Sequence, residues 1–173
     1  SEMCIRDRLI PVYNVEKYVR RCLFSVLNQT MQEGVEVIIV NDCTPDHSME
    51  EIFEALRAYS GNERGEKMSV RVVNHDTNHG LAVVRNTAMN YATGDYVIHV
   101  DSDDWIEPDM LEKLYACAMD TKADIVCCNI SLEYKSRQEN LCYPYKEEQY
   151  KDLLYIDVLR CSCLLYTSDA ADE

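Results

Sequence analysis

The sequence YVIHVDSDDW, at residues 96–105, predicts the fold of this chain and the place of its functional site. An apolar run there leads directly into three aspartates within four positions, 101 to 104. The run is typical of a buried strand, and an open α/β sheet binds ligands outside the carboxyl ends of its strands. Carboxylates this close repel one another unless a positive charge lies among them. We therefore predict that Asp101 and Asp103 hold a divalent cation, Mg²⁺ or Mn²⁺, which takes carboxylate oxygens and keeps positions open for phosphates.

The acidic residues have a simpler alternative explanation. Acids also gather at helix N-termini, where the helix dipole favours them, and Pro108 is typical of the first turn of a helix. This alternative accounts for Glu107 and Asp109, and it can extend to Asp104. It does not account for Asp101, which ends the apolar run directly, or for Asp103 beside it.

Strand-like apolar runs alternate along the chain with amphipathic stretches of helical period. The predicted strands are 9–13, 35–40, 70–73, 96–100 and 124–130, and the predicted helices are 15–27, 49–56, 81–92, 111–118 and 150–160. Residues 133–149 are expected to form a loop or, as the alternative, a hairpin. This alternation predicts βαβ units and a largely parallel sheet. Right-handed crossovers then bring the carboxyl ends of the strands to one edge. The residues expected at that edge are Tyr13, Asn14, Asp42, the loop 78–80 and the acids 101–104.

Length and charge limit the classes of protein to which the chain can belong. Its 173 residues suffice for one domain with a real core. Lys plus Arg number 17 and Asp plus Glu number 31, a net charge of −14. A balance this acidic argues against nonspecific binding to nucleic acid or to anionic lipid, so no nucleic-acid partner is expected.

The nine cysteines do not form a recognisable metal or disulfide pattern. They include no CxxC pair and no zinc-like spacing, and several fall on apolar faces of predicted elements, where a free thiol packs as a small hydrophobe. We interpret them as reduced thiols of a cytoplasmic protein. No stretch of sequence approaches the ~18 consecutive apolar residues of a membrane-spanning helix.

Four motifs in order resemble the nucleotide-sugar-binding half of family 2 glycosyltransferases of the GT-A fold. They are IPVYN at 10–14, VND at 40–42 with Asp46, NHG at 78–80 with RN at 85–86, and DSDD at 101–104. The resemblance runs from about Leu9 to Ile130. It implies a Rossmann-like α/β/α sandwich with a mostly parallel central sheet, incomplete at the C-terminus of this chain.

The resemblance also implies roles for residues at the predicted edge. Pro11, Tyr13 and Asn14 would line the site of the nucleotide base, and Asp42 would bond to the base, usually uracil. Gly80 would belong to the same donor site. Plain packing is the alternative role for Tyr13, because tyrosines are often partly buried.

Further roles implied by the resemblance concern the diphosphate and the sugar. Arg85 would approach the base or the diphosphate, with a surface ion pair to Asp95 or Glu107 as the alternative. The acidic loop would complete the donor site: Asp101 would contact the ribose or sugar, Ser102 would lie beside it, Asp103 would ligate the metal and Asp104 would lie near the donor sugar.

The chemistry implied is inverting transfer of a sugar, most simply from a UDP-sugar, to a glycan or lipid-linked acceptor. A metal on Asp103 would stabilise the leaving diphosphate as a Lewis acid, and the acceptor hydroxyl would need a general base. We find no suitable base downstream, since Asp152 and Asp157 lack context. We expect 8–132 to be the donor-binding domain, 133–162 to begin an incomplete acceptor region, and 1–7 and 163–173 to be non-native ends.

Three alternatives stand beside this prediction. A haloacid-dehalogenase-type phosphatase also has a strand that ends in DxD, but its nucleophile strand would be expected early in the chain. An EF-hand fails because Trp105 replaces a ligand and Ile106 replaces the turn glycine. A nucleotide-binding module without turnover fits a donor site that lacks a base. By resemblance, the setting is the cytoplasm or the inner face of the cell membrane, with peripheral membrane association.

Overall fold

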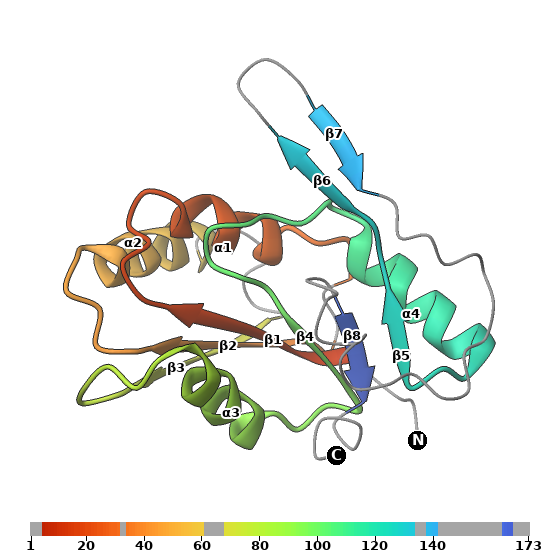
Figure 1. Ribbon diagram of the computed structural model, residues 1–173, viewed down its shortest axis with the longest axis horizontal. Coiled ribbons are helices and arrows are strands. Elements are labelled where there is room, and N and C mark those ends of the chain that lie inside the picture. The colour runs from red at the N-terminus through yellow and green to blue at the C-terminus, as the bar shows by residue number, and fades with distance from the viewer. Residues whose placement is uncertain (1–4, 32–33, 61–67, 134–137, 142–163, 168–173) are drawn as a thin grey trace.

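The structure is a computed structural model that describes residues 5–31, 34–60, 68–133, 138–141 and 164–167 (Figure 1). The strands are β1 (Ile5–Val12), β2 (Glu36–Asn41), β3 (Ser69–Asn74), β4 (Tyr96–His99), β5 (Ile125–Cys127), β6 (Ile130–Glu133), β7 (Gln138–Leu141) and β8 (Leu164–Thr167). The helices are α1 (Val19–Leu27), α2 (Ser48–Ser60), α3 (Leu81–Tyr91) and α4 (Met110–Thr121). Within these ranges, no helix has the length and apolar character that crossing a membrane requires.

The central sheet has the strand order β3-β2-β1-β4-β8-β5. β1 pairs in parallel with both β2 and β4, and β2 pairs in parallel with β3. The predicted α/β class with a mostly parallel sheet is therefore confirmed. The registers Val12↔Asn41 and Asn41↔Asn74 align the ends of β1, β2 and β3. Consequently, the loops that follow these strands leave the sheet from the same edge.

Helices cover both faces of the sheet (Figure 1). Helices α1, α2 and α4 pack against one face, where Ile10, Ile39 and Ile98 are buried. Helix α3 packs against the other face through Val84 and Ala88. Because adjacent strand residues point to opposite faces and both faces are covered, the central strands are continuous apolar runs. This arrangement explains why they are so clear in the sequence.

The first strand begins at Ile5, earlier than the predicted Leu9 and inside the segment that was expected to lie outside the domain. Its early residues include Asp7 and Arg8, which are fully buried. The Asp7 carboxylate accepts a hydrogen bond from the Gly94 N–H at 2.8 Å, and the Arg8 guanidinium donates to the Met31 carbonyl at 2.8 Å. Hydrogen bonding makes the burial of these polar groups tolerable, so a search for apolar residues missed this part of the strand.

The C-terminal part of the sheet also differs from the prediction. Residues 164–167, expected to lie beyond the domain, form β8, which pairs antiparallel with both β4 and β5. The predicted strand 124–130 is divided into β5 and the start of β6. β6 pairs antiparallel with β7, as expected for the alternative of a hairpin after residue 133. The predicted helix 150–160 lies outside the described residues.

Candidate functional site

A pocket lies at the edge of the sheet where the parallel strands end. It has a volume of about 330 Å³, and we call it the edge pocket. Its lining includes the predicted site residues Pro11, Tyr13, Asp42, Gly80 and Ser102. The rest of the lining is formed by four residues for which no donor-site role was predicted: Val12, Asn78, Leu81 and Val84. The parallel register therefore brings most of the predicted base-site residues to one cavity, as expected.

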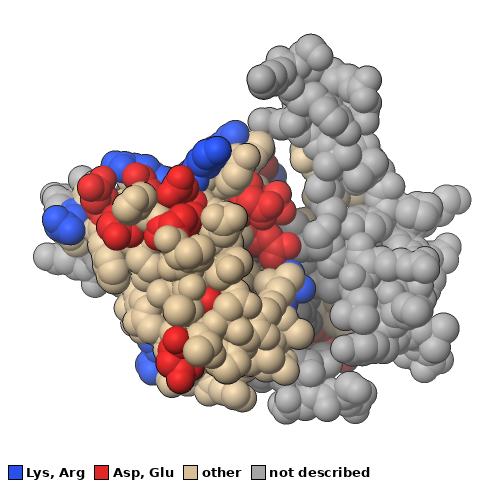
Figure 2. Space-filling model, turned by 60° about the vertical axis from the view of Figure 1, so that its left-hand side comes forward, with Lys and Arg blue, Asp and Glu red and all other residues tan. Residues whose placement is uncertain are grey.

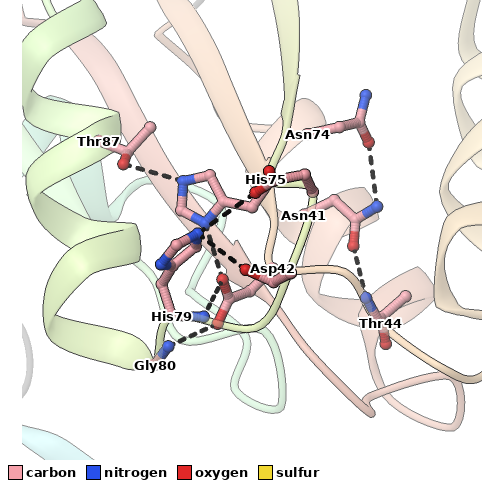
Figure 3. Close-up of polar contacts among 10 residues, drawn as sticks. Asn41, Asp42, Thr44, Asn74, His75, His79, Gly80 and Thr87 are labelled. Carbon is pink, nitrogen blue, oxygen red and sulfur yellow. Dashed lines mark hydrogen bonds and ion pairs between the residues drawn. The ribbon is translucent and has the colours of Figure 1, made fainter.

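Asp42 is the most highly connected side chain of the edge pocket (Figure 3). Only 2% of this residue is exposed. One carboxylate oxygen, Oδ1, accepts hydrogen bonds from the ring Nδ1 of His75 at 2.7 Å and from the His79 N–H at 2.9 Å. The other oxygen, Oδ2, accepts the Gly80 N–H at 2.8 Å. A carboxylate offers about four lone-pair positions, and Oδ2 accepts one hydrogen bond from the described residues, so it has capacity for a second donor.

The hydrogen bonds to Asp42 keep its carboxylate ionised. Burial by itself raises the pKa of Asp42. The hydrogen bonds from His75 and from the His79 and Gly80 backbone outweigh burial and lower the pKa below its ordinary value. The site therefore presents a fixed negative charge at the edge of the pocket.

Two loops beside the pocket have unusual backbone conformations. Asn14 and Cys43 both adopt φ of 56°, in the left-handed region that non-glycine residues seldom occupy. The Asn14 N–H donates to the Thr44 hydroxyl at 2.7 Å, which ties the loop after β1 to the loop after β2. Asn14 is not among the residues that line the edge pocket, although we expected it at the base site. α1 begins at Val19 rather than directly after Asn14.

Asp46 holds these two loops together. Its carboxylate accepts hydrogen bonds from the Thr44 hydroxyl at 2.7 Å, the Ser48 hydroxyl at 2.6 Å and the Glu16 N–H at 2.9 Å. Burial alone raises the pKa of Asp46, but the hydrogen bonds from Ser48, Thr44 and the Glu16 backbone outweigh it and lower the pKa to about 2. The Asp46 network gives the loops a shared anchor beside the pocket.

The Asp46 network predicts a specific loss of stability in acid. The pKa of Asp46 is about 2 in the folded protein and about 3.9 when unfolded. Its contribution is therefore complete above about pH 4 and is lost as the pH falls through about 2. Urea unfolding across this range should show the free-energy difference between wild type and Asp46→Asn shrinking as the pH falls. A constant difference would contradict this role.

The acidic loop follows β4 beside the edge pocket. Asp101 accepts a hydrogen bond from Nη2 of Arg85 at 2.8 Å, so the two form an ion pair. The expected alternative partners of Arg85, Asp95 and Glu107, are not the ones observed. Asp103 is exposed, with neighbours of the same sign. The repulsion predicted from sequence is therefore only partly relieved, by Arg85.

The charges of the acidic loop act on the groups around it. Asp104 is exposed, yet partial desolvation, followed by the charges of Asp103 and Asp101, raises its pKa. Burial and the nearby Arg85 lower the pKa of His99 to about 4, so this imidazole is neutral near pH 7. Figure 2, turned toward the side where the strands end, shows several groups of acidic side chains, with basic ones mainly at the margins. The local field therefore favours a cation.

Helix α1 and the residues after it position the acidic loop, an arrangement that was not predicted from the sequence. The Cys22 thiol donates to the Asp101 carbonyl at 3.5 Å, and the Ser25 hydroxyl accepts the Ile106 N–H at 3.1 Å. Gln29, only 1% exposed, donates to the Glu107 carbonyl at 2.7 Å and accepts the Leu111 N–H at 3.2 Å. The one sequence feature that could have indicated the buried Gln29 is its place three residues after the apolar Val26.

An aromatic contact adds to these interactions between α1 and the acidic loop. The guanidinium of Arg21, on α1, lies over the Trp105 ring at 3.1 Å from its centroid. A cation over an aromatic face is attracted by the ring quadrupole. α1 therefore holds both the start of the acidic loop and the residue that follows its last aspartate.

The donor set of the acidic loop fits a hard divalent cation. Among the described residues, no group of three or more His, Cys, Asp or Glu is arranged to hold a metal ion by itself, so a cation here would also need ligands from a substrate or from water. Asp101 has one oxygen on Arg85, whereas Asp103 is exposed. Mg²⁺ is commonly held by one or two carboxylates, with substrate phosphates and water completing its shell. Asp103 and the second oxygen of Asp101 match that arrangement.

Comparison with solved structures identifies the fold. The structure of Staphylococcus aureus TarS, residues 1–349, matches 98% of this chain and 48% of its own, with a TM-score of 0.75 and 24% sequence identity. This likeness shows that the chain has a fold of the GT-A type, as the fold prediction stated. Residues 9–163 match the family model for glycosyl transferase family 2, and the chain belongs to this family.

Curated relatives agree with this assignment. EpsH of Bacillus subtilis, which bears the name of a glycosyltransferase, is 38% identical over 145 residues, or 81% of this chain and 39% of EpsH. The glycosyltransferase GlyA of Streptococcus pneumoniae is 40% identical over 131 residues, or 73% of this chain and 17% of GlyA. The chain therefore spans about two fifths of EpsH and less than a fifth of GlyA.

Proposed function

We propose that this chain binds a nucleotide sugar, specifically a UDP-sugar, with its base in the edge pocket and its diphosphate toward the acidic loop. The observation that carries the proposal is the convergence of Tyr13, Asp42 and Ser102 on one cavity. TarS has been solved with UDP and with UDP-GlcNAc; the latter structure is 25% identical to this chain, with a TM-score of 0.72.

The base end of the proposed site has two suitable groups. Tyr13 is 47% exposed at the pocket, so its ring is open to stacking against a planar base. The remaining lone pair on Asp42 Oδ2 suits an N–H donor such as that of uracil. Burial and an ionised acceptor strengthen such a hydrogen bond relative to a neutral, solvated one.

The diphosphate end would use the acidic loop. A divalent cation held by Asp103 and Asp101 would supply Lewis-acid stabilisation to the leaving diphosphate. Arg85 contacts the Asp101 carboxylate through their ion pair, which would keep it in place, and Asp104 would lie near the donor sugar. A mannosyltransferase of Pyrobaculum calidifontis with the same fold has been solved with GDP-Man and Mn²⁺, at a TM-score of 0.59 and 21% identity.

Family membership supports a proposal for the wider reaction. We propose that the whole enzyme transfers the sugar with inversion to a glycan or lipid-linked acceptor. The chondroitin synthase of Pasteurella multocida, 36% identical over 125 residues, is a relative with a glycan product in its name. The proposed setting is the cytoplasm or the inner membrane face, with peripheral association. Because the chain belongs to family 2 of the glycosyltransferases, we do not retain the phosphatase alternative. We assign no residue the role of general base.

Donor binding can be tested directly on this chain. Titration calorimetry with UDP in excess Mn²⁺ or Mg²⁺ should show binding that weakens at least tenfold in EDTA, because the cation links Asp103 to the diphosphate. GDP and ADP serve as comparison ligands and should bind more weakly. Absent binding, or equal binding with and without metal, would overturn the proposal. Binding without sugar transfer would favour a nucleotide-binding module.

A further inference from the structure

His75 occupies a position that the parallel register creates. The last aligned pair of β2 and β3 is Asn41↔Asn74, and the His75 N–H donates to the Asn41 carbonyl at 2.9 Å. The next residues, Asp42 and His75, therefore leave the sheet side by side. No role followed for His75 from the sequence, because its partners lie on other segments.

The imidazole of His75 connects three elements (Figure 3). Its Nδ1 lies 2.7 Å from Asp42 Oδ1, and its Nε2 lies 2.9 Å from the Thr87 hydroxyl on α3. An ionised carboxylate only accepts hydrogen bonds. Nδ1 therefore carries the proton, and in the neutral ring Nε2 accepts from Thr87. The His75 and Asp42 side chains are 11% and 2% exposed, so the link is shielded from water.

This link reaches the edge pocket through Asp42, which lines it. The same carboxylate accepts the backbone N–H groups of His79 and Gly80. Asn78 and Gly80 line the edge pocket, whereas His75 does not. If the imidazole bond to Asp42 is lost, the carboxylate gains freedom to turn, and the 78–80 segment loses its fixed acceptor.

We propose that His75 is a positioning residue of the donor site, which orients Asp42 and the 78–80 segment for a nucleotide that His75 itself does not touch. This inference rests on the proposed function and deepens it. Preorganisation of this kind acts on affinity, because a pocket already in its bound shape loses less conformational freedom on binding. A histidine with a purely structural role would instead change stability alone.

Two amide substitutions separate the two ends of the imidazole. The side-chain nitrogen of His75→Asn lies where Nδ1 lies, so it retains the donor to Asp42 and loses Thr87. The side-chain nitrogen of His75→Gln lies where Nε2 lies, so it retains Thr87 and loses the donor to Asp42. His47→Gln is the matched control, since the His47 side chain is 82% exposed.

The expected result is a difference between these variants in UDP affinity, measured by calorimetry on samples whose thermal melts show a folded protein. His75→Gln should raise the Kd at least tenfold, whereas His75→Asn and His47→Gln should stay within threefold of wild type. The ratio of Kd in EDTA to Kd in Mn²⁺ should not change in His75→Gln, because His75 acts at the base end. Equal Kd values for His75→Gln and wild type, or equal losses in both His75 variants, would overturn the proposal.

A readout without nucleotide keeps this inference separate from the proposed function. In His75→Gln, the amide protons of His79 and Gly80 should exchange with solvent at least tenfold faster than in wild type, while His75→Asn retains most of the protection. Unchanged exchange would overturn the positioning role even if UDP binds. If wild type binds no UDP but His79 and Gly80 still exchange faster in His75→Gln than in wild type, the proposed donor site is wrong and the orienting contact of His75 stands. Should both His75 variants fail to fold, Thr87→Val should speed the same exchange and Thr87→Ser should not; equal rates would refute the link.

Discussion

Asp42→Ala is expected to lower the free energy of unfolding by about 2–4 kcal/mol and to abolish detectable UDP binding. The substitution removes the acceptor from three donors, the His75 ring and the N–H groups of His79 and Gly80. Each hydrogen bond to a charged group contributes about 1.5–3 kcal/mol, and the contributions of neighbours are not additive. Urea unfolding and calorimetry with UDP measure the two effects.

The control for Asp42→Ala is Asp120→Ala, which removes an exposed carboxylate from α4 and should change stability by no more than about 0.5 kcal/mol. The pH dependence gives a second check. Because the pKa of Asp42 is lowered in the folded protein, its contribution is present above the unfolded pKa and is lost as the pH falls through the folded pKa. The difference between wild type and Asp42→Ala should therefore shrink in acid. A loss under 1 kcal/mol at neutral pH would contradict the anchoring role.

Asp103→Ala is expected to weaken UDP binding about 100-fold in excess Mn²⁺, equivalent to about 2.7 kcal/mol, and to leave it unchanged in EDTA. Asp103 is an exposed carboxylate of the acidic loop, and its removal would take away the proposed metal contact to the diphosphate. Thermal stability should stay the same or rise slightly, because the substitution removes the repulsion between Asp103 and its acidic neighbours Asp101 and Asp104. Calorimetry with and without EDTA, together with a thermal melt, tests both parts.

Arg85→Ala provides the contrasting variant for Asp103. It removes the ion pair with Asp101 and the positive charge beside the pocket, neither of which depends on a metal. Its loss of UDP affinity should therefore persist in EDTA. If Asp103→Ala weakens binding equally with and without metal, the assignment of the metal to the acidic loop is wrong.

The fold was predictable where local pattern carries the information. The central strands are covered on both faces, so they are unbroken apolar runs, and the helices show stripes such as Val19, Cys22 and Val26, all buried against the sheet. The apolar pattern did not predict strand residues that are polar, buried and hydrogen-bonded. Asp7 and Arg8 in β1 are the clearest case, since their partners come from distant loops. β8 was missed because four residues carry too little periodic signal.

The candidate site was predictable to a similar degree. The parallel register brings Pro11, Tyr13, Asp42 and Ser102 to one pocket, as their places at strand ends required. Asn14 was expected in that pocket and instead uses its backbone N–H to tie two loops together. Arg85 was expected at the base or the diphosphate, or in an ion pair with Asp95 or Glu107, and it contacts Asp101.

The sequence by itself determined the alternation of strands and helices, the residues at the strand ends and the family. These depend on local composition and spacing, which neighbouring residues carry. Only the tertiary structure decided which side chains act on one another: Asp42 with partners 33 to 38 positions away, and the acidic loop with Cys22, Ser25 and Gln29 on or after α1. The physical reason is that a hydrogen bond requires donor and acceptor within about 3 Å. That proximity results from register and helix packing, which no short stretch of sequence contains.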